Sequence, residues 1–194
     1  MRYSFDLRRQ SGVSLIEILV VVAIIAVLGA FAFPNMGGWN CSREVRNDFD
    51  QINGLLQTLR LEAMSRNASM MARQSNSNNT TLEAWGFDSQ PGRQACGSGS
   101  WTYLGRAGGV GQDIEINDVV MDRATFRSTV GFPVCFHADG TVSRSGSATP
   151  SSATVEINAL CDGDMHRYRT NIFGATGFLE LSKWKIRTRQ WEEM

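Results

Sequence analysis

The chain has 194 residues, which suits one globular domain with an appended segment and is too short for a fusion of two enzymes. Lysine plus arginine and aspartate plus glutamate both total 19, so net charge alone does not recruit a nucleic acid or an acidic partner. Any such partner has to be recruited by a local patch of charge.

The amino-terminal part of the chain is dominated by one long apolar run. Residues 18–33 have no polar side chain, and the run counted from Val13 contains only Ser14 and Glu17 as polar residues. About 20 apolar residues in a helix span the bilayer core of roughly 30 Å. We therefore expect a transmembrane or filament-core helix over 13–34. A secretory signal peptide and a buried core helix are the alternatives, but the run lacks a small-residue cleavage pattern and leads into an amphipathic segment.

Arginines flank the apolar run on both sides. Arg2, Arg8 and Arg9 precede it, whereas Arg43 and Arg46 follow it. The excess of positive charge before the run favours an amino terminus on the cytoplasmic side of a membrane.

Glu17 is the one carboxylate in the run, and a carboxylate costs about 2 to 3 kcal/mol near the middle of a bilayer. It should therefore have a partner. If the chain is cut between Gly12 and Val13, the new amino group lies one helical turn from Glu17, and the amino group of a neighbouring copy could approach the same carboxylate. The alternative is that Glu17 lies at the level of the lipid head groups and stays hydrated.

The segment SGVSLIEILVVVAIIAVLGAFAFPNM resembles the class III leader and helix of type IV pilins and type II secretion pseudopilins. Their pattern is a glycine, an apolar residue, [ST]-L-[IV]-E and a long apolar helix. The resemblance implies a leader peptide over 1–12, cleavage between Gly12 and Val13 by a prepilin peptidase, and methylation of the Val13 amino group. It also implies an assembly role for Glu17 and a helix kink at Pro34. Val13 stands where most relatives have phenylalanine.

The segment 35–75 is predicted to form an amphipathic helix. Apolar residues recur there at steps of three and four, at Val45, Phe49, Ile52, Leu56, Leu59 and Ala63. The polar run QSNSNNTT, residues 74–81, is expected to be the loop that ends this helix. We expect the apolar stripe to pack on a sheet, with a coiled-coil seam against another subunit as the alternative.

The remainder, 76–194, is expected to form a β-rich globular domain. Short apolar runs separated by glycine- and proline-containing turns predict strands at 82–87, 114–121, 129–137, 154–160, 166–172 and 177–186. A long helix followed only by strands predicts an α+β fold, with the helix packed on an antiparallel sheet.

Four cysteines lie outside the predicted membrane segment: Cys41, Cys96, Cys135 and Cys161. They lack the paired spacing of a zinc site, so no metal is expected, and an even number in an exported chain favours disulfides. Of the three possible pairings we prefer Cys135 with Cys161, because both lie in strand-like runs and closing that loop would stabilise the fold by about 3 kcal/mol. Cys41 would then pair with Cys96.

No phosphate-binding glycine loop, zinc-protease helix or nucleophile elbow occurs in the sequence. His137 and His166 do not have the spacing of a catalytic pair with a serine or a cysteine. We therefore expect no enzyme activity and no cofactor.

The carboxyl-terminal run 183–191 alternates cations with other residues. In a single strand, period two would place four cations on one face: Lys183, Lys185, Arg187 and Arg189. Arg167 and Arg169 repeat that spacing in a preceding strand, so six cations could form a stripe, with Trp184 or Trp191 at an edge to stack on bases. The alternative, which we favour, is a solvated outer face opposite a buried Trp184 and Ile186.

Three later patterns resemble the GspH/FimT branch of the family, which includes FimU-like minor pilins. They are LLQTLRLEAMSRNASM, Trp85-Gly86-Phe87 and TVGFPVCFHADGTV. This resemblance implies a minor pilin or pseudopilin that joins or primes a type IV pilus or a type II secretion pseudopilus, with other minor pilins and the major pilin as partners.

The same resemblance implies a location in the bacterial inner membrane, with the carboxyl-terminal domain in the periplasm, followed by transfer to the filament tip. A DNA-binding minor pilin for DNA uptake is the alternative. Some relatives used in DNA uptake have a glycine followed by arginines near the end, whereas here Gly177 is followed by Phe178-Leu179-Glu180.

Overall fold

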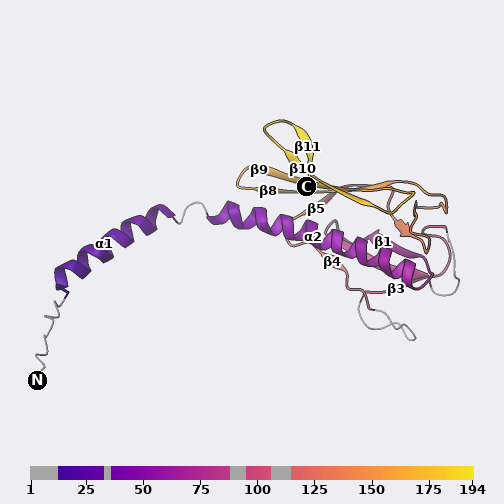
Figure 1. Cartoon of the computed structure of the whole chain (residues 1–194), viewed down its shortest axis with the longest axis horizontal. Helices are drawn as coiled ribbons and strands as arrows, with labels where there is room; N and C mark the ends of the chain where they lie inside the picture. The colour runs from indigo at the N-terminus through magenta and orange to yellow at the C-terminus, as the bar shows by residue number, and fades with distance from the viewer. Residues whose placement is uncertain (1–12, 33–35, 88–94, 106–114) are drawn as a thin grey trace, which may run out of the picture. The chain divides into compact units, whose positions relative to one another are not determined.

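The computed structural model describes residues 13–32, 36–87, 95–105 and 115–194, which are drawn in colour in Figure 1. The chain divides into two compact units, Met1–Trp39 and Asn40–Met194. The first unit contains helix α1 (Leu15–Ala32). The second contains helix α2 (Met36–Ser65) from Asn40 onward, together with every described strand. The predicted α+β class is confirmed.

The described strands form two antiparallel sheets, whereas a single one is expected from the sequence. The first sheet has the order β3-β2-β1-β6-β7, with β4 beside β2, and consists of β1 (Met70–Gln74), β2 (Thr81–Phe87), β3 (Trp101–Tyr103), β4 (Val119–Val120), β6 (Val134–Phe136) and β7 (Val142–Arg144). The second has the order β11-β10-β9-β8-β5 and consists of β5 (Thr125–Val130), β8 (Ala153–Cys161), β9 (Asp164–Ile172), β10 (Leu179–Lys185) and β11 (Gln190–Glu193).

Helix α2 is the predicted amphipathic helix, but it ends at Ser65 and not at residue 75. Asn67 has a φ of 52°, and the amide of Ala68 donates to the carbonyl of Ala63 at 3.1 Å. This is a Schellman end, in which a residue in the left-handed region stops the helix. The predicted boundary is wrong because asparagine adopts that conformation at low cost, which the apolar periodicity does not reveal.

The residues after this helix end form strand β1, which pairs with β2. The polar run 74–81 therefore connects two strands of a hairpin and does not end the helix. The predicted strand 129–137 is also divided, because its first residues lie in β5 of the second sheet and its later ones in β6 of the first. Pro133 stands between them and has no amide to donate to a sheet.

The predicted strand 114–121 is much shorter in the structure. Among the described residues of that segment, only Val119 and Val120 are in a strand. Position 114 itself lies outside the described ranges.

The predicted apolar stripe of α2 forms the centre of the core. All six of its members are fully buried: Val45, Phe49, Ile52, Leu56, Leu59 and Ala63. The ring of Phe49 stacks on that of Tyr168 in β9, with the ring centroids 5.0 Å apart. Apolar residues of both sheets belong to the same cluster, so the stripe packs on sheet as predicted. Burial of each such large side chain contributes about 1.5 to 3 kcal/mol.

All four cysteines form disulfides, but the preferred pairing is wrong. Cys41 is bonded to Cys161, and Cys96 is bonded to Cys135. Cys135 lies in β6 of the first sheet, whereas Cys161 ends β8 of the second sheet. The predicted pair is therefore separated between two sheets, and each cysteine bonds to a residue that the fold brings beside it.

Candidate functional site

The structure places Val13 and Glu17 at the start of α1. Val13 is 66% exposed and precedes the helix, which begins at Leu15. The carbonyl of Ser14 accepts hydrogen bonds from the amides of Glu17 at 3.0 Å and Ile18 at 3.3 Å. Glu17 therefore occupies the first turn, where its negative charge interacts favourably with the helix dipole.

Two other predicted residues of this region, Gly12 and Pro34, lie outside the described residues, as does the predicted leader 1–12. Of the two residues that the predicted cleavage bond joins, the structure thus describes only Val13. Glu17 follows Val13 by four positions, of which Leu15–Glu17 are helical. The pairing of Glu17 with an amino terminus stays a prediction.

Helix α1 carries apolar side chains on all of its sides. Those from Val13 to Leu28 are between 48% and 78% exposed wherever they are large and hydrophobic. A helix that is apolar all round is stable when lipid or other helices surround it. Within the described ranges, no helix meets the length and apolar character required to cross a membrane.

The carboxyl-terminal run does not form the single strand that a cationic stripe requires. β10 ends at Lys185 and β11 begins at Gln190, so Arg187 and Arg189 lie in the turn between the two strands. Arg189 has a φ of 52° there. The period-two argument fails in this run because the chain reverses inside it. Lys185 Nζ donates to the carboxylate of Glu192 at 2.6 Å.

The cations of β9 and β10 also lie on opposite faces of the second sheet. Lys183 is in register with Tyr168, whose ring packs on α2, so Lys183 shares the helix-facing side. Arg169 is in register with Ser182, one position along, and therefore lies on the other side. The predicted stripe of six cations is wrong for this reason.

Arginine and tryptophan side chains gather on the outer face instead. Trp184 and Trp191 are directly opposed on β10 and β11, with ring centroids 5.4 Å apart. The guanidinium of Arg169 lies 3.8 Å from the ring centroid of Trp191, and that of Arg167 lies 5.7 Å from Trp184. Arg169 also forms a 3.0 Å salt bridge with Glu156. These tryptophan rings therefore pack on arginines of the same chain.

His137 directly follows β6 of the first sheet, and His166 lies in β9 of the second sheet. His137 is 1% exposed, and its ring nitrogens lie 2.9 Å from Ser69 Oγ and 2.7 Å from Ser143 Oγ, so it joins three segments of the first sheet region. His166 lies in β9, where burial and the nearby charge of Lys183 lower its pKa. The geometry does not bring the two rings together into one site.

Glu83, in strand β2 of the first sheet, is paired with an arginine and a tryptophan. Arg73 Nη2 lies 2.8 Å from its Oε2, and Trp85 Nε1 donates to the same oxygen at 3.1 Å. Burial raises the pKa of Glu83, but hydrogen bonds from Ser75, Arg73 and Trp85, with the charge of Arg73, outweigh burial and lower it. These contacts fix the carboxylate of Glu83 in position, which is a structural role.

Comparison with known families gives one match. Residues 7–33 match the prokaryotic N-terminal methylation motif, a segment that includes Gly12, Val13 and Glu17. Comparisons with curated proteins and with solved structures gave no match. The chain therefore carries a prepilin leader of the type IV pilin kind, of the sort that a prepilin peptidase processes.

Proposed function

We propose that this protein is a structural subunit, not an enzyme, of a type IV pilus or of the related type II secretion pseudopilus. Prepilin peptidase cleaves it after Gly12 and methylates the amino group of Val13. The observation that carries this proposal is the methylation motif over 7–33, with Glu17 one turn from the new amino terminus. The proposed partners are the peptidase, other minor pilins or pseudopilins, and the major pilin.

The surface of α1 supports an assembly role for this helix. Its side chains are apolar on every side, which suits lipid before assembly and neighbouring helices afterwards. Glu17 is unfavourable in lipid, and pairing with the amino group of a neighbouring subunit would remove that cost. We propose that the segment 13–34 spans the inner membrane until the subunit enters the filament.

The second unit supports display outside the cytosol. Both of its disulfides, Cys41–Cys161 and Cys96–Cys135, are of a kind that persists in an oxidising compartment such as the periplasm. The proposed branch is that of the GspH/FimT minor pilins, on the three local patterns of the sequence. In the structure, the first of these patterns covers the end of α2, the Asn67 turn and the start of β1.

Replacing the residue before the cleavage bond tests this function directly. In Gly12→Val the peptidase should leave the leader attached, because a branched side chain stands where the motif has glycine. The intact mass and the amino-terminal sequence of the protein from cells measure this outcome, and the amount of the subunit in sheared filaments measures assembly. Gly29→Ala, in the same apolar run, is the control and should be processed normally. Normal processing and assembly of Gly12→Val would contradict the proposal.

DNA binding for uptake remains the second candidate. Arg187 and Arg189 are exposed in the β10–β11 turn, and neither forms a salt bridge with a described residue. Such a turn could contact phosphates, with an affinity that falls as salt rises. Gel-shift titrations of the full chain in detergent, at several salt concentrations, should show weaker binding in Arg187→Ala/Arg189→Ala. Equal binding by that variant would contradict a DNA-binding site in this turn.

A further inference from the structure

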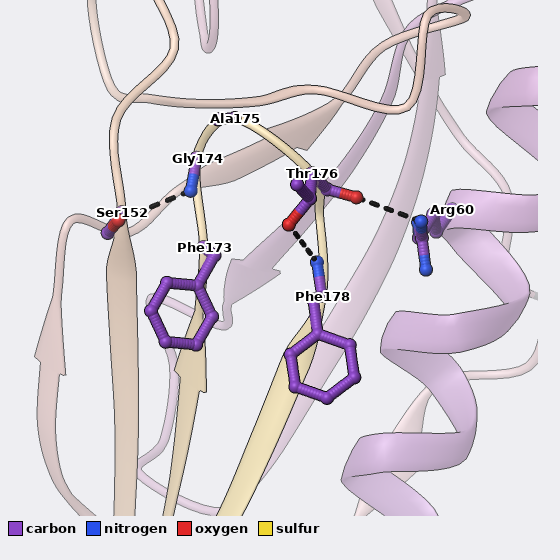
Figure 2. A pocket seen from close by; sticks show the side chains of 7 residues that line it. All are labelled: Arg60, Ser152, Phe173, Gly174, Ala175, Thr176 and Phe178. Carbon is purple, nitrogen blue, oxygen red and sulfur yellow. Dashed lines mark hydrogen bonds between the residues drawn. The ribbon is translucent and has the colours of Figure 1, made fainter.

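Helix α2 runs along the second sheet from one end of β9 to the other. The Cys41–Cys161 disulfide joins an early turn of the helix to the end of β8, with the two Cα atoms 5.8 Å apart, and Cys161 lies opposite the first residue of β9. Beyond the last residue of β9, Arg60 Nη2 donates to the carbonyl of Thr176 at 2.8 Å, as the dashed line in Figure 2 marks. The second sheet thus has a near end, at the disulfide, and a far end, at Thr176.

The β10–β11 turn, residues 186–189, lies at the near end. The register between β9 and β10, extended by two residues, places Lys185 opposite His166. His166 is opposite Ala159, which precedes Cys161 by two positions in β8. Two strand spacings of about 4.8 Å separate β8 from β10 at this level, so the turn begins about 10 Å from the disulfide.

The near end is tied closely to the proposed membrane segment 13–34. That segment ends seven positions before Cys41. Seven residues reach at most about 25 Å even when they are fully extended. The near end therefore stays within about 25 Å of the bilayer core before assembly, whatever orientation the two units take. The far end is roughly 30 Å away, because nine residues of β9 at about 3.3 Å each separate the two ends.

The β10–β11 turn and the strand beside it present cations without counter-charges. Arg187 and Arg189 are exposed, and neither forms a salt bridge with any residue in the described ranges. Arg167 of β9 is also without one there, and its Nε is buried with no hydrogen-bond partner among the described residues. A surface that carries phosphates would supply the missing negative charge.

The same turn presents an apolar side chain. Two residues are expected from the sequence to be buried opposite the cations, and that expectation is wrong. Trp184 is only partly buried and shares the outer face with Arg167, whereas Ile186 is 51% exposed because it lies in the turn and not in a strand. Cations beside an exposed apolar side chain suit a lipid surface, where the apolar group enters the head-group region and the cations bind anionic lipids.

The hairpin that carries this turn is stiff at its base. The rings of Trp184 and Trp191 are directly opposed, with centroids 5.4 Å apart, and Lys185 forms a 2.6 Å salt bridge with Glu192. Figure 1 shows the β10–β11 hairpin, in yellow, projecting from the other strands of the second sheet. A stiff, projecting hairpin presents its turn to a surface and loses little conformational freedom when it binds there.

Two carboxylates at the near end limit the extent of such a contact. Asp162 and Asp164, in and beside the β8–β9 turn, are exposed. Neither forms a salt bridge within the part of the chain that the structure describes. An anionic surface repels both groups, so it is contacted by the β10–β11 turn and not by the β8–β9 turn.

We propose that the β10–β11 turn rests on anionic lipid head groups of the bilayer that α1 spans before assembly. Arg187 and Arg189 bind lipid phosphates, and Ile186 enters the head-group region. This inference rests on the proposed function, since the second unit is held at a bilayer only if the segment 13–34 spans it. The contact orients the second unit on the membrane and is released when the subunit enters the filament.

Photo-crosslinking of the full chain in lipid nanodiscs tests the proposal. p-Benzoylphenylalanine replaces Ile186 or, as the control, Phe178, which is 58% exposed at the far end and is labelled in Figure 2. The nanodiscs contain equal parts of phosphatidylglycerol and phosphatidylcholine, or phosphatidylcholine alone. Mass spectrometry should find lipid adducts at position 186 in the anionic nanodiscs and few at position 178. Each arginine removed in Arg187→Ala/Arg189→Ala should lower the yield about fivefold, and the neutral lipid should lower it similarly.

Neutralising the nearby carboxylates supplies a matching arm. Asp162→Asn/Asp164→Asn should raise the yield at position 186, because the repulsion from the anionic lipid is removed. Equal yields at positions 186 and 178 would overturn the proposal, as would a yield that responds neither to the arginines nor to the lipid. Arginine-dependent gel shifts with DNA, without lipid adducts, would assign the turn to DNA and would also overturn it.

Co-elution of the chain with the nanodiscs separates this inference from the proposed function. A chain that does not co-elute would refute the membrane segment and the lipid contact together. Co-elution without adducts at position 186 would refute only the lipid contact.

Discussion

Thr170 of β9 donates a hydrogen bond to Asn53 of α2, from Oγ1 to Oδ1 at 2.6 Å, and both residues are buried. Asn53 in turn donates from Nδ2 to the carbonyl of Phe49 at 2.8 Å. The helix and the second sheet are thus joined through a polar contact inside an otherwise apolar interface. A buried polar pair of this kind fixes which residues of the two elements lie opposite each other.

Removing one partner of this pair should destabilise the second unit. Thr170→Val leaves the Asn53 oxygen buried without a donor, which should lower the free energy of unfolding by about 1 to 3 kcal/mol. Adding Asn53→Leu should recover part of that loss, because both polar groups are then absent. Urea unfolding followed by circular dichroism measures both changes. Thr58→Val, on the exposed side of α2, is the control, and an equal effect there would contradict the role of the buried pair.

Asp48 should be the most sensitive carboxylate of α2. It is 1% exposed, and its oxygens accept hydrogen bonds from the backbone amides of Asp122, Arg123 and Ala124 at 2.9 to 3.2 Å. Asp48→Ala leaves these amides without their acceptor, and the expected loss is about 2 to 3 kcal/mol of the free energy of unfolding.

The control for this change is Asp50→Ala. Asp50 pairs with Arg46 at 3.7 Å on the exposed side of the same helix, where an ion pair contributes about 0 to 1 kcal/mol. Thermal unfolding of both variants should show a much larger decrease in the unfolding temperature for Asp48→Ala. Similar decreases would mean that the three backbone hydrogen bonds contribute little.

Protonation of Glu83 should lower the free energy of unfolding of the protein in acid. Its pKa is lower in the folded chain than the ordinary value of about 4.3, so the unfolded state binds its proton first as the pH falls. The stabilisation is therefore complete above that value and is lost as the pH decreases through the folded pKa. Glu83→Gln should be less stable than the natural protein at pH 7, by about 1 kcal/mol, and the difference should shrink below about pH 4.

Unfolding free energies of both proteins between pH 7 and pH 3 measure this difference. Glu193→Gln, at an exposed position of β11, serves as the control for the removal of one carboxylate. A difference that stays constant down to pH 3 would contradict the assignment of the acid response to Glu83.

The two disulfides should differ in their contribution to stability. Cys41–Cys161 closes a loop with a sequence separation of 120, and Cys96–Cys135 closes one of 39. Loop-closure entropy predicts contributions of about 5 and about 4 kcal/mol, respectively. Double replacement by alanine should therefore lower the unfolding temperature more for the first pair. The opposite order would show that packing around the cysteines outweighs chain entropy.

The amino-terminal site could be predicted from the sequence because its determinants are contiguous. Gly12, Val13 and Glu17 lie within six residues, and the family match covers them without any knowledge of the fold. The α2 stripe could be predicted for a similar reason, since positions three and four apart share a helix face whatever the helix packs on.

The features that could not be predicted depend on contacts between distant segments. The pairing of Cys41 with Cys161 follows from α2 lying beside the end of β8, which no local pattern specifies. The hairpin within 183–191 could not be predicted because the alternation continues through it, and only the pairing of β10 with β11 shows that the chain turns back. The hydrogen bond from Arg60 to the carbonyl of Thr176 joins a helix to a loop more than 110 positions away.

The disulfide between Cys41 and Cys161 also determines how the second unit would respond to mechanical load. A pull on the helix ahead of Cys41 passes through the sulfur–sulfur bond into β8, so the chain between the two cysteines carries no tension while that bond is intact. When the other end of the pull is the carboxyl terminus, only the segment after Cys161 can be drawn out, strand by strand from β11. Most of the unit is thereby shielded from extension by such a pull.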